Sequence, residues 1–279
     1  MTLKVGRPQT IGGVLDHAFR LYFRTFRAVW ILALGGSLVW LPVSILVLWA
    51  LQTTSGVFTM PLWLWGVLLV AGLISVWCYT AQMWRIHALV EETPLPLGAS
   101  LVASLAKLPT VVVASVAYFI LLGLVGVGLT IAGVLVIDPS SLLARAALVL
   151  VLLIPAAVLY VSLYFYLPVM VVDGAGAFAS LARSGSLVRG NWFRAATTLT
   201  VGTILWMVLY IVAGFLGEVA GAPFGDGLIG FFIAQAVTLL ASGLVLPFLA
   251  ALSLAIYYDL KLRREGGDLL ARAQAVGAA

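Results

Sequence analysis

The sequence predicts an all-α, polytopic integral membrane protein, and two features of its composition support this class. Of its 279 residues, 63% are hydrophobic and only 9% are charged, whereas an average soluble domain is about 25% charged. So few charges could not cover the surface of a water-soluble globule. The apolar residues also gather into long uninterrupted runs, as expected for helices that cross a bilayer.

Six runs reach the roughly 20 apolar residues that a transmembrane helix needs. We expect spans over residues 28–50, 61–84, 110–137, 142–172, 195–216 and 228–258. Residues 52–56 and 138–141 form short polar turns, and residues 217–227 form a longer glycine-rich connection. Because these connections are short, the spans should form three antiparallel pairs within one transmembrane domain that covers residues 1–279.

The basic residues predict the direction of the spans. With six spans, fourteen of the fifteen Lys and Arg residues fall on one side, and Arg145 alone falls on the other. The positive-inside rule then places the N-terminus, the C-terminus and residues 259–279 in the cytoplasm. The predicted location is therefore the cell membrane (inner or plasma), crossed several times, and an odd number of spans would destroy the charge separation.

A threefold pattern precedes the helix pairs. Moderately polar segments over residues 11–27, 97–107 and 175–194 start about 80 residues apart, a spacing typical of internal repeats. Each opens at a glycine and ends near a basic residue. We infer three divergent units over residues 11–90, 97–172 and 175–258, each with a cytoplasmic interfacial helix before its pair of spans.

The first of these helices, expected over about residues 9–27, has the profile of a helix lying in the membrane interface. Apolar side chains recur at helical spacing and form one stripe of the helix. The opposite stripe is expected to be basic. The apolar stripe holds Leu15, Ala18, Phe19, Tyr22, Phe23 and Phe26, and the opposite stripe holds His17, Arg20, Arg24 and Arg27.

These basic residues have two interpretations. Arg20, Arg24 and Arg27, together with Lys261, Arg263 and Arg264 after the sixth span, are the predicted contacts for anionic lipid head groups. The simpler interpretation is that the same arginines only anchor the topology. The sequence leaves both open.

No arrangement of residues predicts catalysis, a metal site or a cofactor. His17 and His87 lack neighbours at metal-ligand spacing, and no nucleophile elbow, HExxH helix or Walker A loop occurs. Asp173, Asp259 and His87 are the only residues that could serve an intramembrane enzyme. We expect a protein that is not an enzyme and does not bind nucleic acid.

Polar side chains inside the spans suggest an alternative function. Gln82, Tyr160, Tyr164 and Gln235 could line a mid-membrane site, and helices broken by proline are common in transporters. Pro42, Pro155, Pro168 and Pro247 should kink or break four spans. Hydrogen bonding between helices is the simpler role for the polar groups.

Three stretches carry a resemblance to a known family. They are IGGVLDHAFRLYFRTFRAVWIL (residues 11–32), SGSLVRGNWFRA (184–195) and AIYYDLKLRREGGDLLAR (255–272). Together they resemble the bacterial glycerophosphoryl diester phosphodiesterase membrane-domain family. In that family the membrane region is joined to a soluble metal-dependent barrel, which no part of these 279 residues could supply. The resemblance therefore implies the membrane module without the phosphodiesterase activity.

These observations favour an accessory or scaffold module in the membrane. Its expected partners are membrane lipids, anionic ones in particular, and a membrane protein, with the oligomeric state left open. The alternative is a small permease or lipid transporter with a site near mid-membrane.

Overall fold

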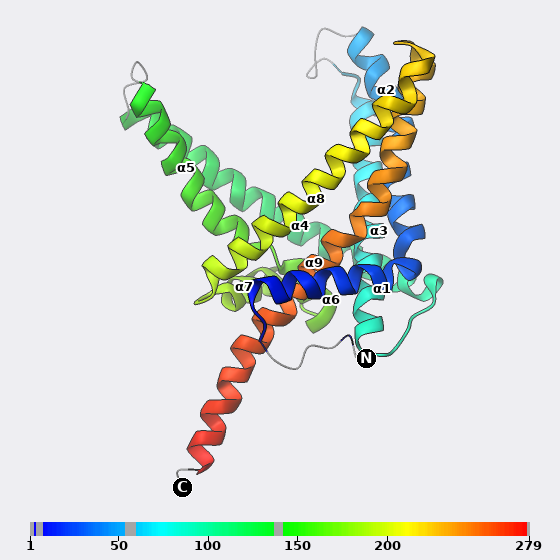
Figure 1. The fold of residues 1–279 in the computed structure, drawn as a ribbon. Helices are drawn as coiled ribbons and strands as arrows, with labels where there is room; N and C mark the ends of the chain where they lie inside the picture. Colours follow the sequence, from blue (N-terminus) through cyan, green and yellow to red (C-terminus); the bar gives the residue numbers. More distant parts are fainter. Residues whose placement is uncertain (1–2, 4–7, 54–59, 137–141, 278–279) are drawn as a thin grey trace. The chain divides into compact units, whose positions relative to one another are not determined.

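The structure is a computed structural model that describes residues 3, 8–53, 60–136 and 142–277. These residues form α-helices and one 3₁₀-helix at Ala222–Phe224 (Figure 1). The α-helices are α1 (Ile11–Leu38), α2 (Trp40–Thr53), α3 (Leu62–Val90), α4 (Leu97–Val136), α5 (Leu142–Leu163), α6 (Tyr166–Asp173), α7 (Ala177–Val188), α8 (Trp192–Gly221) and α9 (Leu228–Gly277). The predicted all-α class is confirmed.

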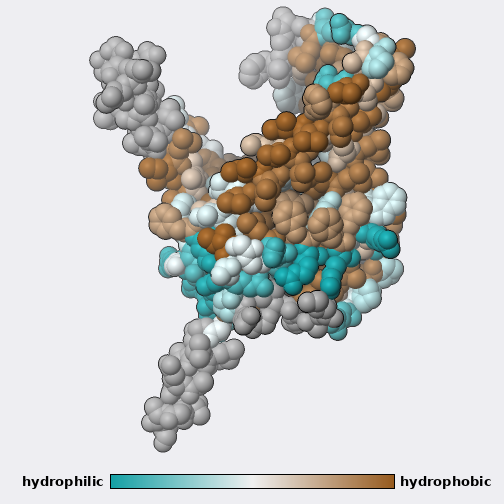
Figure 2. Space-filling view, viewed as in Figure 1, coloured by the Kyte–Doolittle hydropathy of each residue, from teal (hydrophilic) through white to brown (hydrophobic). Residues whose placement is uncertain are grey.

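Six helical stretches are long and apolar enough to cross a membrane, as predicted. Among the described residues they are Ile11–Thr53, Leu62–Val90, Leu97–Gly128, Leu153–Asp173, Trp192–Phe224 and Leu228–Gly266. Their surfaces carry large apolar side chains in the open, such as Ile211 (60% exposed) and Phe215 (66%) on α8. Figure 2 shows this hydrophobic surface along α8. Such a surface is stable against lipid, so the protein is a multi-pass membrane protein.

Several helices continue past the predicted ends of their apolar runs. Helix α3 ends at Val90, beyond the predicted end at residue 84. Helix α4 begins at Leu97 and therefore joins the second predicted interfacial segment to its span. Helix α8 reaches Gly221, so part of the predicted 217–227 connection is helical. Lipid sets a minimum helix length, but a helix can continue into water wherever its sequence contains no strong breaker.

The last helix also continues past the predicted end of its span. Helix α9 runs to Gly277, so the sixth span continues as a helix beyond residue 258. Residues 138–141 and most of the predicted 52–56 turn lie outside the described residues, as does the side chain of Arg145.

Proline interrupts two of the four spans in which it was predicted to act. Pro42 lies in the first turn of α2, just after the break at Val39, and Pro168 lies in the first turn of α6, just after a break at residues 164–165. Proline is tolerated in a first turn because the backbone N–H it lacks has no partner within the helix there. Helices α5 and α9 continue through Pro155 and Pro247.

The chain forms two compact units. Unit 1 holds Met1–Leu108 and Thr198–Ile256, and unit 2 holds Pro109–Thr197 and Tyr257–Ala279. Helices α4, α8 and α9 therefore each contribute to both units. The predicted single domain with three repeats stays a prediction.

In unit 1, α1 begins where the side chain of Thr10 accepts a hydrogen bond from the N–H of Gly13 at 3.1 Å, which satisfies a backbone donor of the first turn. The helix changes direction along its length (Figure 1). It packs against α3, and a Cβ at Gly36 would lie 3.1 Å from the Cβ of Cys78. Small residues thus allow a close approach of the two helices.

Hydrogen bonds fix these contacts in unit 1. The indole N–H of Trp40 donates to Ser75 Oγ at 2.8 Å, and that hydroxyl donates to the carbonyl of Gly36 at 2.9 Å. The hydroxyl of Tyr22 donates to the carbonyl of Leu244 on α9 at 3.0 Å. Each of these hydrogen bonds joins two helices, so the polar side chains are satisfied within the apolar interior of unit 1.

Glycines in α8 and α9 allow these helices to touch. A Cβ at Gly221 would lie 2.6 Å from the carbonyl oxygen of Gly230 and 2.8 Å from the Cβ of Ala234, whereas one at Gly214 would meet nothing within 4 Å. We therefore expect Gly221→Ala to lower the free energy of unfolding by about 1–3 kcal/mol through overpacking. Gly214→Ala, the matched control in the same helix, should be neutral or slightly stabilising. Thermal unfolding in detergent measures both, and equal effects would contradict this packing.

Candidate functional site

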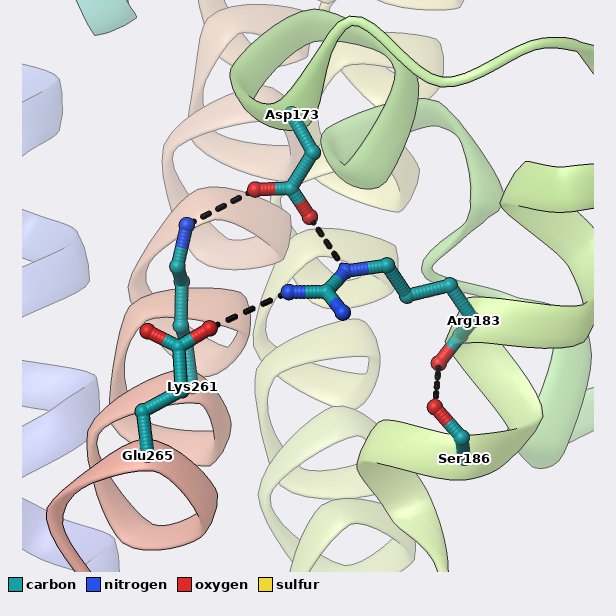
Figure 3. A network of polar contacts seen from close by, with 5 residues as sticks. All are labelled: Asp173, Arg183, Ser186, Lys261 and Glu265. Atoms are coloured by element: carbon teal, nitrogen blue, oxygen red, sulfur yellow. Dashed lines mark hydrogen bonds and ion pairs between the residues drawn. The ribbon is translucent and has the colours of Figure 1, made fainter. Parts of the chain in front are cut away.

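Charged side chains of unit 2 form a network around Asp173, the last residue of α6 (Figure 3). The Asp173 carboxylate accepts a hydrogen bond from Arg183 Nε of α7 and another from Lys261 Nζ of α9, each at 2.7 Å. Arg183 also donates from Nη2 to Glu265 of α9 at 3.1 Å. The network therefore joins α6 and α7, which follow one another in the sequence, to α9, which is far from both.

Local structure places Arg183 in this network. Helix α6 stops at Gly174, whose φ of 68° suits glycine, and the chain then enters α7. The hydroxyl of Ser184 donates to the carbonyl of Ser162 at 2.8 Å and accepts from the N–H of Phe165 at 3.1 Å. These bonds satisfy backbone groups at the break between α5 and α6 and hold α7 beside it.

The Asp173 carboxylate also affects the protonation of Arg183. The hydrogen bond from Arg183 to Asp173 and the negative charge of that carboxylate raise the pKa of the guanidinium above its ordinary value. The side chain of Asp173 is 15% exposed, whereas those of Arg183 and Lys261 are 43% and 28% exposed, so water screens these two ion pairs in part.

A second carboxylate, Asp259 of α9, is more deeply buried, with 5% of its side chain exposed. Its Oδ2 atom accepts from Arg194 Nε at the start of α8 and from Arg263 Nε one turn further along α9, each at 2.9 Å. Arg264 in turn donates to the backbone carbonyl of Arg189 at 3.3 Å.

The network carries an excess of positive charge. Among the described side chains, its cations are Arg183, Arg194, Lys261, Arg263 and Arg264, and its carboxylates are Asp173, Asp259 and Glu265. These five cations against three carboxylates leave two positive charges in excess. An anion such as a phosphate group would be attracted to this surface.

The predicted lipid contacts after the sixth span are already engaged within the protein. Lys261 pairs with Asp173, Arg263 pairs with Asp259, and Arg264 binds a backbone carbonyl. Sequence reasoning missed these roles for the two aspartates, which it considered only as possible parts of an enzyme. The i, i+4 spacing of Asp259 and Arg263 was the one signal that could have indicated a pair.

The predicted basic stripe of α1 is open to the surroundings, since Arg20, Arg24 and Arg27 are all exposed. The assignment of His17 was wrong, because this residue was expected on the basic stripe and is only 4% exposed. Phe23 of the predicted apolar stripe is 70% exposed, and its ring contacts the rings of Phe19 and Tyr22 of the same stripe. The physical reason is that the buried side of α1 faces other helices of unit 1 and is centred on residues such as Ala18 and Leu21.

The four residues of the predicted transporter site fall into different units. Gln82 and Gln235 belong to unit 1, and Tyr160 and Tyr164 belong to unit 2. Gln82 is fully buried, and neither its amide nitrogen nor its oxygen has a hydrogen-bond partner among the described residues. The rings of Tyr160 and Tyr164 lie 5.5 Å apart.

The three residues that could serve an intramembrane enzyme lie in helices and have other contacts or positions. Asp173 and Asp259 hold the ion pairs described above, and His87 lies in the last turn of α3. Within the described part of the chain, no three His, Cys, Asp or Glu side chains come close enough together to hold a metal ion.

Comparison with known proteins identified no relative of this chain. No protein-family model, no curated protein sequence and no solved structure matches this chain.

Proposed function

We propose that this chain is an accessory module of the cell membrane whose exposed basic residues bind the head groups of anionic lipids. The observation that carries the proposal is the exposed stripe of Arg20, Arg24 and Arg27 on α1, next to the exposed ring of Phe23. An aromatic ring that enters the apolar layer beside arginines that stay at the head groups is the arrangement of an interfacial helix.

The ion-pair network of unit 2 supports the same proposal in a different way. Its internal pairs hold α6, α7 and α9 together, and the two excess positive charges among its described side chains remain to attract lipid phosphate. Lys261, Arg263 and Arg264 would then act mainly in positioning, with lipid contact as a secondary role. The arginines of α1 would contribute most of the lipid affinity.

The proposal includes a direction and a finer architecture. Six spans form three antiparallel pairs, each preceded by a cytoplasmic interfacial segment, and both termini lie in the cytoplasm with the basic residues. A distinct helix α7 before α8 supports this for the third pair. The proposal also places the chain beside the membrane region of the glycerophosphoryl diester phosphodiesterase membrane-domain family, without catalytic activity of its own.

Native mass spectrometry of the full chain tests the lipid proposal. The protein is placed in nanodiscs that contain equal amounts of phosphatidylglycerol, which is anionic, and phosphatidylcholine, which is zwitterionic. We expect the released protein to retain phosphatidylglycerol preferentially and in a fixed ratio. Equal retention of the two lipids, or retention of neither, would overturn the proposal.

A further inference from the structure

Unit 1 contains a pocket of about 800 Å³ where α2 ends, α3 begins and α9 begins. Its volume falls within the range of small-molecule sites, roughly 300–1,000 Å³. Apolar side chains such as Ile45, Leu48 and Phe231 form much of its wall. The proposed orientation places this pocket on the non-cytoplasmic side, away from the basic residues that would bind anionic lipid.

Two tryptophans give the pocket an aromatic wall. The ring centroids of Trp49 and Trp63 lie 6.3 Å apart at an angle of 35°, and each side chain is about half exposed, at 50% and 49%. The face of an indole ring attracts organic cations more strongly than that of any other side chain. Two such rings beside one pocket therefore favour a positively charged ligand.

A carboxylate completes the same wall. Asp226 lies just before α9 and lines the pocket, and none of the described residues that line it is Lys or Arg. A smaller hollow of about 310 Å³ shares Asp226 and Phe231 with the large pocket and adds a second acidic residue, Glu218. The local charge is negative, so a cation is attracted and a phosphate group is repelled.

The turn that carries Asp226 is held in place by backbone contacts. Gly225 adopts a φ of 74°, and Gly225, Gly221 and Gly230 approach one another so closely that an added Cβ at Gly221 or Gly230 would strike a carbonyl group. Asp226 is thus attached to a well-defined turn. A fixed carboxylate loses little conformational entropy when a ligand binds.

We propose that this pocket binds an alkylammonium ion, with the ammonium group held by Trp49, Trp63 and Asp226 and the alkyl chain lying along Ile45, Leu48 and Phe231. The lack of a basic residue among the described lining residues leaves no cationic partner for a lipid phosphate. A free organic cation with an apolar chain fits this wall better than a phospholipid head group does. The site consists of residues other than those of the proposed anionic-lipid surface, and it prefers the opposite charge.

Binding of labelled decyltrimethylammonium to the full chain in phosphatidylcholine nanodiscs tests the proposal, with empty nanodiscs measuring partition into the bilayer. We expect saturable binding, weakened about fivefold by Asp226→Asn and by Trp63→Leu, since each removes an attraction of about 1 kcal/mol at a partly exposed site. An uncharged decyl glucoside should not compete. Circular dichroism and thermal unfolding establish that each variant is folded.

Glu92→Gln is the matched control, because Glu92 is an exposed acid of unit 1 that does not line the pocket. It should leave binding unchanged. Binding that does not exceed the empty nanodiscs, or binding that folded Asp226→Asn retains in full, would overturn the proposal.

Discussion

Replacing Asp259 by Asn is expected to lower the free energy of unfolding by about 3–5 kcal/mol, the usual cost of removing one member of a buried ion pair. Asp259 has 5% of its side chain exposed, and its Oδ2 atom receives hydrogen bonds from both Arg194 and Arg263. An Asn side chain has nearly the same shape but no charge, so two guanidinium groups would lose the negative charge that they share. Urea or thermal unfolding of the purified protein in detergent measures the change.

Glu265→Gln is the matched control for this prediction. Glu265 also pairs with an arginine of the network, but its side chain is 50% exposed. Removing the charge of an exposed pair costs about 0–1 kcal/mol. Adding Arg263→Gln to Asp259→Asn should recover part of the loss, because one of the two excess cations is removed. Equal and small effects for Asp259→Asn and Glu265→Gln would show that the network does not hold these helices together.

Replacing Arg20, Arg24 and Arg27 together by Gln is expected to weaken the binding of anionic lipid about 100-fold. Each basic residue near an anionic membrane surface contributes about 1 kcal/mol, so three contribute roughly 3 kcal/mol. All three side chains are exposed, so the substitutions should leave the fold intact. Native mass spectrometry of nanodiscs with a rising fraction of phosphatidylglycerol measures the lipid retained at each composition.

The same three positions changed to Lys provide the control. Lysine keeps the charge, so retention of anionic lipid should remain close to that of the wild type and should fall with added salt in both proteins. If the Gln variant retains as much phosphatidylglycerol as the Lys variant, the arginines of α1 serve only to anchor the topology, which was the simpler interpretation of the sequence.

The spans could be predicted because the bilayer imposes one strong requirement on length and composition. Six runs met it, and six stretches of the structure do so as well. The ends of the helices were less predictable. Helix α3 continues past Trp84, α4 already begins at Leu97, and α8 continues to Gly221. Residues outside the bilayer are not constrained by lipid, so only weak helix propensities decide where each helix ends.

The contacts of the site could be predicted only where they are local. Asp259 and Arg263 are one turn apart, whereas Asp173 and Lys261 are brought together by the packing of α6 and α9. The spacing of residues within one helix cannot predict such a pair. The misplacement of His17 has a similar cause, because periodicity gives the apolar side of α1 but does not show which part of the helix other helices cover.

Labelling of single cysteines with a membrane-impermeant maleimide on intact cells tests the central claim most directly, that six spans place the basic residues on the cytoplasmic side. In a Cys78→Ala background, which removes the native cysteine, new cysteines are introduced one at a time at exposed positions. We expect Gln52→Cys and Ala222→Cys to be labelled on intact cells, and Glu92→Cys and Glu265→Cys only after permeabilisation. The reverse pattern, or labelling of all four on intact cells, would contradict the account.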